Sequence, residues 1–184
     1  VENGYTQPEP YSGNWSQRVQ LTEAMLRGEI AMMINGPWLT NRFRNEAPDI
    51  RFGVAPMPYN TRPATYGVVD ALVMFSTSHH KDATWSFIET LYTYENRLEY
   101  SISAGIVPVL QAVAEAPELV NDPEFAVFLS LLSQAQFEPL HIRSESISNT
   151  VINQLIPVYR GETSATEALD SASSQINDLL QTPA

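Results

Sequence analysis

The stretch from Arg27 to Trp38 constrains the fold more than any other, because a helix end, an apolar run and a helix start follow each other within it. Residues 15–26 carry apolar side chains at helical spacing, and Gly28 follows where a left-handed residue commonly ends a helix. Ile30–Ile34 is an unbroken apolar run of strand length, which predicts a parallel strand covered on both faces. This order of elements is typical of an α/β protein.

The residues after this run have the features of a ligand-binding loop. Asn35-Gly36 breaks the apolar run, and Pro37 suits the first turn of a new helix. Trp38 is therefore expected between the end of a strand and the start of a helix, where ligands collect in open α/β sheets. Its flat face could stack on a sugar ring, and Asn35 could bond hydroxyls. The alternative is that Trp38 fills the core and Asn35 only makes a turn.

The segment Gly28–Trp38 resembles the "GK-aliphatic-AM…-G-x-W" segment of extracellular solute-binding proteins of the maltose and multiple-sugar type, which serve ABC importers. Further segments resemble the same family in the same order: Asp49–Pro58, Tyr66–Leu72, Lys81–Ile88, Ala104–Val109 and Arg160–Leu169. Together they extend across nearly the whole chain. They match only the carboxyl-terminal part of the family, whose members are much longer.

The resemblance implies a helix-rich α/β fold of the periplasmic-binding-protein-like type II, of which this chain would be a carboxyl-terminal fragment. That fold has two lobes with the solute between them. Residues 1–62 and 110–184 would belong to the carboxyl-terminal lobe, and residues 63–109 would form a crossing strand and helices of an incomplete amino-terminal lobe.

Local patterns predict the remaining elements. Residues 1–14 read as a loop, residues 52–56 as a short strand, residues 56–63 as an extended segment and Val68–Phe75 as a second buried strand. Capping residues and apolar spacing predict helices over residues 81–92, 95–103, 123–134, 144–159 and 165–180, which makes the second half helix-rich.

Two further places are candidate ligand contacts. Asp70 is the only charge in the run Val68–Phe75, and a buried carboxylate there would need hydrogen-bond donors such as sugar hydroxyls; a surface turn is the alternative. Through the resemblance, ligand contacts are expected in the turn with Tyr66 and Gly67 and at Arg143, although Tyr66 could simply pack and Arg143 could form a surface ion pair. The predicted binding residues are Asn35, Gly36, Trp38, Tyr66, Gly67, Asp70 and Arg143.

Composition and motifs argue against several other functions. The net charge of −11 disfavours nucleic acid and anionic membrane surfaces as partners, and the chain has no cysteine for thiolate metal sites. No apolar run is long enough for a membrane span. His79-His80 and Asp82 suggest a metal only weakly, because adjacent histidines point apart. No catalytic pair, nucleophile motif or phosphate loop is recognisable, so the sequence predicts no enzyme, no metal and no cofactor.

The function expected from the resemblance is binding of a mono- or oligosaccharide in an interlobe cleft and its delivery to the permease subunits of an ABC importer. One alternative is the same fold binding a glycerol phosphodiester or other polar solute, with Arg143 as the anion contact. The other is a helical protein-interaction module without a ligand site, in which Trp38 would be buried in the core. The family places such proteins in the periplasm or outside the cell as lipoproteins, with the export signal expected upstream of Val1.

Overall fold

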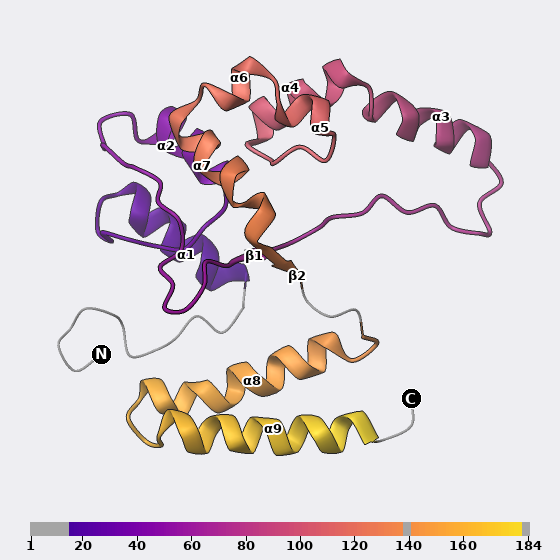
Figure 1. Ribbon diagram of the computed structural model, residues 1–184. Helices are drawn as coiled ribbons and strands as arrows, with labels where there is room; N and C mark the ends of the chain where they lie inside the picture. Colours follow the sequence, from indigo (N-terminus) through magenta and orange to yellow (C-terminus); the bar gives the residue numbers. More distant parts are fainter. Residues whose placement is uncertain (1–14, 138–140, 182–184) are drawn as a thin grey trace. The chain divides into compact units, whose positions relative to one another are not determined.

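The computed structural model describes residues 15–137 and 141–181 (Figure 1). Its internal contacts divide the chain into a smaller unit, residues 1–21 with 138–184, and a larger unit, residues 22–137. Helix α1 (Trp15–Leu26) contains the boundary between the two units and has the bounds that its apolar spacing predicts. The loop expected over residues 1–14 lies outside the described residues.

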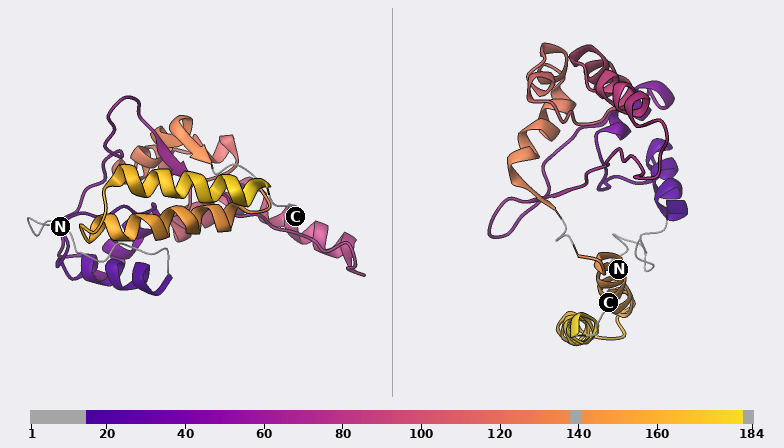
Figure 2. Two further views of the ribbon diagram at one scale, coloured as in Figure 1. Left: turned by 90° about the horizontal axis from the view of Figure 1, so that it is seen from below. Right: turned by 90° about the vertical axis from the view of Figure 1, so that its right-hand side faces the viewer.

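The smaller unit contains a hairpin of two long helices, α8 (Ser144–Tyr159) and α9 (Ala165–Gln181), which run side by side in every view (Figure 2). Gly161 turns the chain between them at φ 73°. The predicted capping box starts α9: Glu167 N donates to Ser164 Oγ at 3.2 Å, and Ser164 N donates to Glu167 Oε2 at 3.1 Å. Ala168 and Ala172 are buried, because small side chains let the two helices approach closely.

The larger unit holds the other helices: α2 (Trp38–Glu46), α3 (Lys81–Leu91), α4 (Tyr94–Ala104), α5 (Gln111–Ala114), α6 (Pro117–Val120), α7 (Pro123–Leu131) and the 3₁₀ turn η1 (Leu132–Gln134). Local signals set several of their ends. Thr93 Oγ1 accepts from Asn96 N at 3.4 Å at the start of α4, and Gly105 ends that helix at φ 64°. The helices expected from residue 81 onward in this unit are confirmed within a few residues.

Two small hydrophobic clusters hold this unit together. One joins α1 and α2 through Leu26, Leu39 and Phe43, with Phe52 stacked on the Phe43 ring at 4.5 Å between centroids. The other joins α5, α6 and α7 and consists of Val113, Leu119 and Phe125. The first cluster anchors α2, the helix that begins at Trp38.

Strands are the element that the sequence predicted poorly. Among the described residues the sheet consists of two short parallel strands, β1 (Thr65–Gly67) and β2 (Ala135–Phe137). The strands expected at residues 30–34, 52–56 and 68–75 are wrong for this structure, because none of these segments has strand structure.

The reason is that a strand requires a neighbouring backbone to bond its N–H and C=O groups, and the apolar runs have none in the part of the chain that is described. Many of their side chains are not buried either: Met32 is 87% exposed, Ile34 77% and Phe75 77%. Figure 1 shows residues 68–80 as an extended chain that leads from β1 to α3.

Candidate functional site

Trp38 stands at the first position of α2 with part of its ring open to solvent. Pro37 precedes it with φ −63°, which suits the entry to a helix. Trp38 is 38% exposed, whereas the next residue, Leu39, is 7% exposed. A Cβ atom at Gly36 would lie only 2.1 Å from the indole ring, so the ring folds back closely over Gly36. The indole is therefore a supported surface platform rather than core filling.

The side chain of Asn35 makes hydrogen bonds in and around the turn that precedes α2. Its Oδ1 accepts from the Gly36 amide at 2.8 Å. Its Nδ2 donates to Thr22 Oγ1 at 3.5 Å and lies 3.8 Å from Met33 Sδ. These contacts match the alternative in which Asn35 makes the turn, and a role in ligand binding stays a prediction.

The end of α4 supports the backbone of Trp38 from another side. A Cβ atom at Gly105 would lie 2.7 Å from Trp38 Cα and 3.1 Å from Pro37 O, so the two backbones pack directly together. Asn41, one turn after Trp38, donates from Nδ2 to the carbonyls of Ile102 and Ser103 at 2.8 and 3.2 Å. These contacts could not be predicted from the sequence, because about sixty positions separate the partners along the chain.

Tyr66 and Gly67 lie on β1, where they pair with β2. Tyr66 is opposite Gln136, and Gly67 is opposite Phe137. A Cβ at Gly67 would lie 2.5 Å from Phe137 Cε1, so the aromatic ring covers the glycine. Tyr66 and Phe137 are both largely exposed. Phe137 is a second exposed aromatic side chain beside β1. The sequence did not indicate it, because only the strand register places Phe137 opposite Gly67.

Asp70 is exposed, and so are all its neighbours from Val68 to Phe75. The expectation of a buried carboxylate is therefore wrong here, and the surface-turn alternative describes its environment. Its proposed contact with a ligand remains a prediction.

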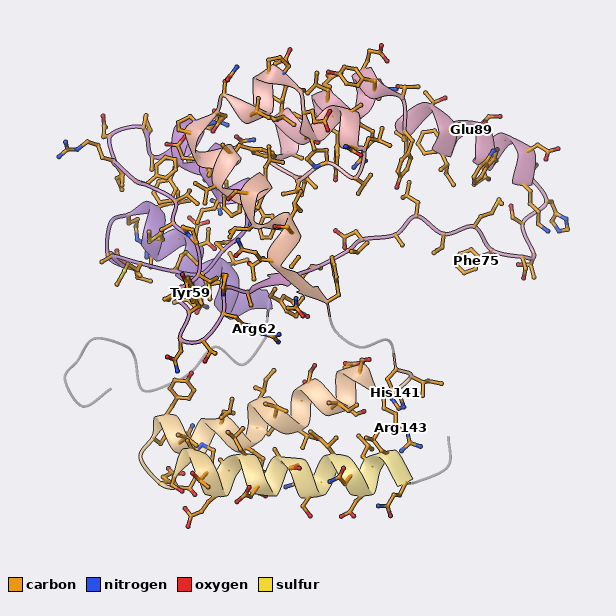
Figure 3. All side chains as sticks on the ribbon, in the orientation of Figure 1. Tyr59, Arg62, Phe75, Glu89, His141 and Arg143 are labelled. Carbon is orange, nitrogen blue, oxygen red and sulfur yellow. The ribbon has the colours of Figure 1, made fainter. Side chains whose placement is uncertain are left out.

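Arg143 belongs to the smaller unit, whereas the other predicted binding residues belong to the larger one. Its guanidinium Nη1 donates to the carbonyl of Leu179 near the end of α9, and its backbone amide donates to His141 Nδ1 at 3.1 Å. Figure 3 shows His141 and Arg143 at the start of α8 beside the end of α9. A cation suits that position, because helix carboxyl ends carry partial negative charge.

Arg44, near the far end of α2, forms ion pairs with two carboxylates at the start of α7. Its Nη1 lies 2.7 Å from Asp122 Oδ2, and its Nη2 lies 2.6 Å from Glu124 Oε2. Asp122 Oδ1 also accepts from the amides of Glu124 and Phe125 and so caps α7. The Arg44 hydrogen bond, helped by these amides, holds the pKa of Asp122 below its usual range. Both ends of α2 are thus anchored.

Other kinds of site are not assembled in the described residues. His79 and His80 do not join a third side chain in any cluster able to hold a metal within residues 15–137 and 141–181. In the same ranges, no helix has the length and apolar character that crossing a membrane requires.

The chain belongs to the bacterial extracellular solute-binding protein family, whose model matches residues 2–127. It is 30% identical over 98% of its length to a Brucella abortus protein named as a binding protein. It is 31% identical over 121 residues to the maltotriose-binding protein of Pyrococcus abyssi. The chain spans 44% of the first of these relatives and 26% of the second.

Solved structures place the chain in the same fold. One is an ABC transporter solute-binding protein of Thermotoga lettingae bound with α-D-tagatose, with TM-score 0.77 and 26% identity over 88% of this chain and 42% of that one. Another is the cyclic α-maltosyl-1,6-maltose binding protein of Arthrobacter globiformis, with TM-score 0.67 and 25% identity over 79% and 39%. This chain is thus a helix-rich α/β part of a two-lobed solute-binding protein.

Proposed function

We propose that the protein containing this chain binds a mono- or oligosaccharide between two lobes and delivers it to the permease subunits of an ABC importer. The observation that carries the proposal is Trp38, a half-exposed indole held at the start of α2 over a glycine. An aromatic face held in this way can cover the C–H face of a sugar ring. Similar proteins support a carbohydrate as the ligand. Two of them are named as binding proteins for maltotriose and for cyclic α-maltosyl-1,6-maltose, and a third was solved with α-D-tagatose bound.

In this proposal the ligand contacts come from several segments. Trp38 stacks on a ring, the Tyr66–Asp70 segment supplies an aromatic surface and a carboxylate, and Arg143 supplies a cation. Residues 1–62 and 110–184 contribute to the carboxyl-terminal lobe, and residues 63–109 to the amino-terminal lobe. The family is extracellular, and we propose a periplasmic or lipid-anchored protein. The protein performs no chemistry on its solute.

Isothermal titration of the full-length protein tests this function. Maltose, maltotriose and α-D-tagatose are titrated, with a glycerol phosphodiester as the competing class. Trp38→Ala should weaken sugar binding by about tenfold or more, because it removes a stacking face worth roughly 1–3 kcal/mol in burial. Trp85→Ala is the matched control, since Trp85 is also exposed but lies on α3.

Binding of the phosphodiester without binding of any sugar would overturn the carbohydrate proposal. Equal effects of the two tryptophan substitutions would remove Trp38 from the site. The interaction-module alternative has less support, because it requires Trp38 to be buried and the residue is 38% exposed.

A further inference from the structure

The start of α2 contacts the end of α4 through Asn41 and Gly105. Neither residue was among the predicted binding residues. The last carbonyls of an α-helix lack partners within the helix and must be bonded by other groups or by water. At the end of α4, Asn41 Nδ2 donates to two of them, Ile102 O at 2.8 Å and Ser103 O at 3.2 Å. Asn41 therefore acts as a cap that is supplied by a different helix.

The same helix end also contacts Trp38 directly. Gly105, which follows the last turn of α4, has φ 64° and packs its Cα against the backbone of Pro37 and Trp38. Gly105 is buried, and a Cβ atom there would collide with Trp38 Cα. The position of the Trp38 backbone therefore depends on the packing of the α4 end against it. The Asn41 amide bonds the same helix end through its two side-chain hydrogen bonds.

The other end of α2 is held independently. Arg44 bonds Asp122 and Glu124 of α7, and Phe43 is buried in the cluster shared with α1. Leu39 and Thr40 on the first turn are also buried, so loss of the Asn41 bonds should leave α2 folded and change only the packing of α4 against the start of this helix. The residue that is carried on this first turn is Trp38.

We propose that Asn41 is a positioning residue that sets the orientation of the Trp38 ring by joining α2 to the end of α4. The role in binding rests on the proposed function, in which the Trp38 ring covers a sugar. Both helices lie in the larger unit, residues 22–137, so this joint belongs to the internal packing of that unit.

The test uses Asn41→Asp in the full-length protein. The substitution keeps the side-chain size but replaces the donor with a carboxylate that faces two carbonyls at the negative end of a helix. Asn45→Asp is the matched control, because Asn45 is an exposed residue of α2 whose side chain makes no hydrogen bond within residues 15–137 and 141–181. Asn41→Ala removes the donor without adding charge and replaces Asn41→Asp if that variant does not fold.

The first measurement follows Trp38 without ligand, by fluorine NMR of protein labelled with 5-fluorotryptophan. The Trp38 resonance is assigned by its loss in Trp38→Phe. Asn41→Asp should shift or broaden this resonance and leave that of Trp85 unchanged, and Asn45→Asp should change neither. An unaltered Trp38 resonance in Asn41→Asp overturns the positioning role whether or not the protein binds sugar.

The second measurement is a double-mutant cycle on sugar affinity. Asn41→Asp should weaken binding about tenfold when Trp38 is present and less than twofold in the Trp38→Ala background. Equal losses in both backgrounds, or no loss in either, would overturn the role in binding. If Trp38→Ala itself leaves sugar affinity unchanged, the proposed function fails, while the resonance shift still decides whether Asn41 orients the ring.

Discussion

The segment around Trp38 and the segment from Tyr66 to Phe75 were both predicted to bind ligand, but the structure supports them very differently. Trp38 begins a helix that is anchored by a buried phenylalanine, by an ion-pair network and by the end of α4. Beyond the short strand β1, residues 68–75 are exposed and unpaired in the described part of the chain. Likeness to a family motif predicts a ligand contact in both segments, but local packing determines whether a side chain is held in place.

The largest expected difference between the two segments concerns apolar burial. Phe43→Ala should lower the free energy of unfolding of the 184-residue chain by about 3–5 kcal/mol, because the ring is 3% exposed and stacks on Phe52. Val73→Ala should change it by less than about 0.5 kcal/mol, because Val73 is 74% exposed. Urea denaturation followed by circular dichroism measures both. A comparable loss in the two variants would show that residues 68–75 are packed as firmly as α2.

A smaller difference is expected between two glycines with positive φ. Gly161→Ala should cost about 1 kcal/mol, since φ is 73° and the space around it is open. Gly105→Ala should cost about 2–4 kcal/mol, because strain at φ 64° is added to a collision with the Trp38 backbone. Thermal unfolding of the two variants measures the difference, and equal costs would mean that α4 does not press on Trp38.

The ion-pair anchor of α2 should make stability depend on pH. The pKa of Asp122 is lowered in the folded state, so its contribution is present above the unfolded value of 3.8 and is lost as the pH falls through the lower folded pKa. Asp122→Asn should lower stability by about 1 kcal/mol at neutral pH, because asparagine can still cap the helix but loses the ion pair with Arg44, and it should reduce the loss on acidification. Urea midpoints compared between neutral and strongly acidic pH test this. If Asp122→Asn leaves the pH dependence of stability unchanged, the ion pair with Arg44 does not anchor α2.

The smallest effect is expected at Asp70. Asp70→Asn should change the free energy of unfolding by less than about 0.5 kcal/mol, because the side chain is exposed. In the full-length protein the same substitution should still weaken sugar binding if the proposed contact is correct. Paired stability and binding measurements separate these effects. A destabilisation near that of Asp122→Asn would show that Asp70 has structural partners.

The prediction from sequence succeeded where the information was local. Thr93, Asp122 and the pair Ser164 and Glu167 cap their helices as expected, because each cap bonds amides only two or three residues away. The bounds of α8 were predicted to the residue, since they depend on apolar spacing within one segment. The apolar runs failed as buried strands because strand formation depends on a partner segment, which a local pattern does not specify.

The candidate site shows the same contrast between features set by local sequence and features set by long-range packing. The sequence by itself determined that a tryptophan would stand at the start of a helix after Gly36 and Pro37, because glycine interrupts the apolar run and proline fixes φ at a value that suits helix entry. Only the tertiary structure decided that Gly105 and Asn41 support this helix from α4, and that Phe137 covers Gly67. Those contacts join residues about sixty to seventy positions apart, and packing rather than local backbone preference selects such partners.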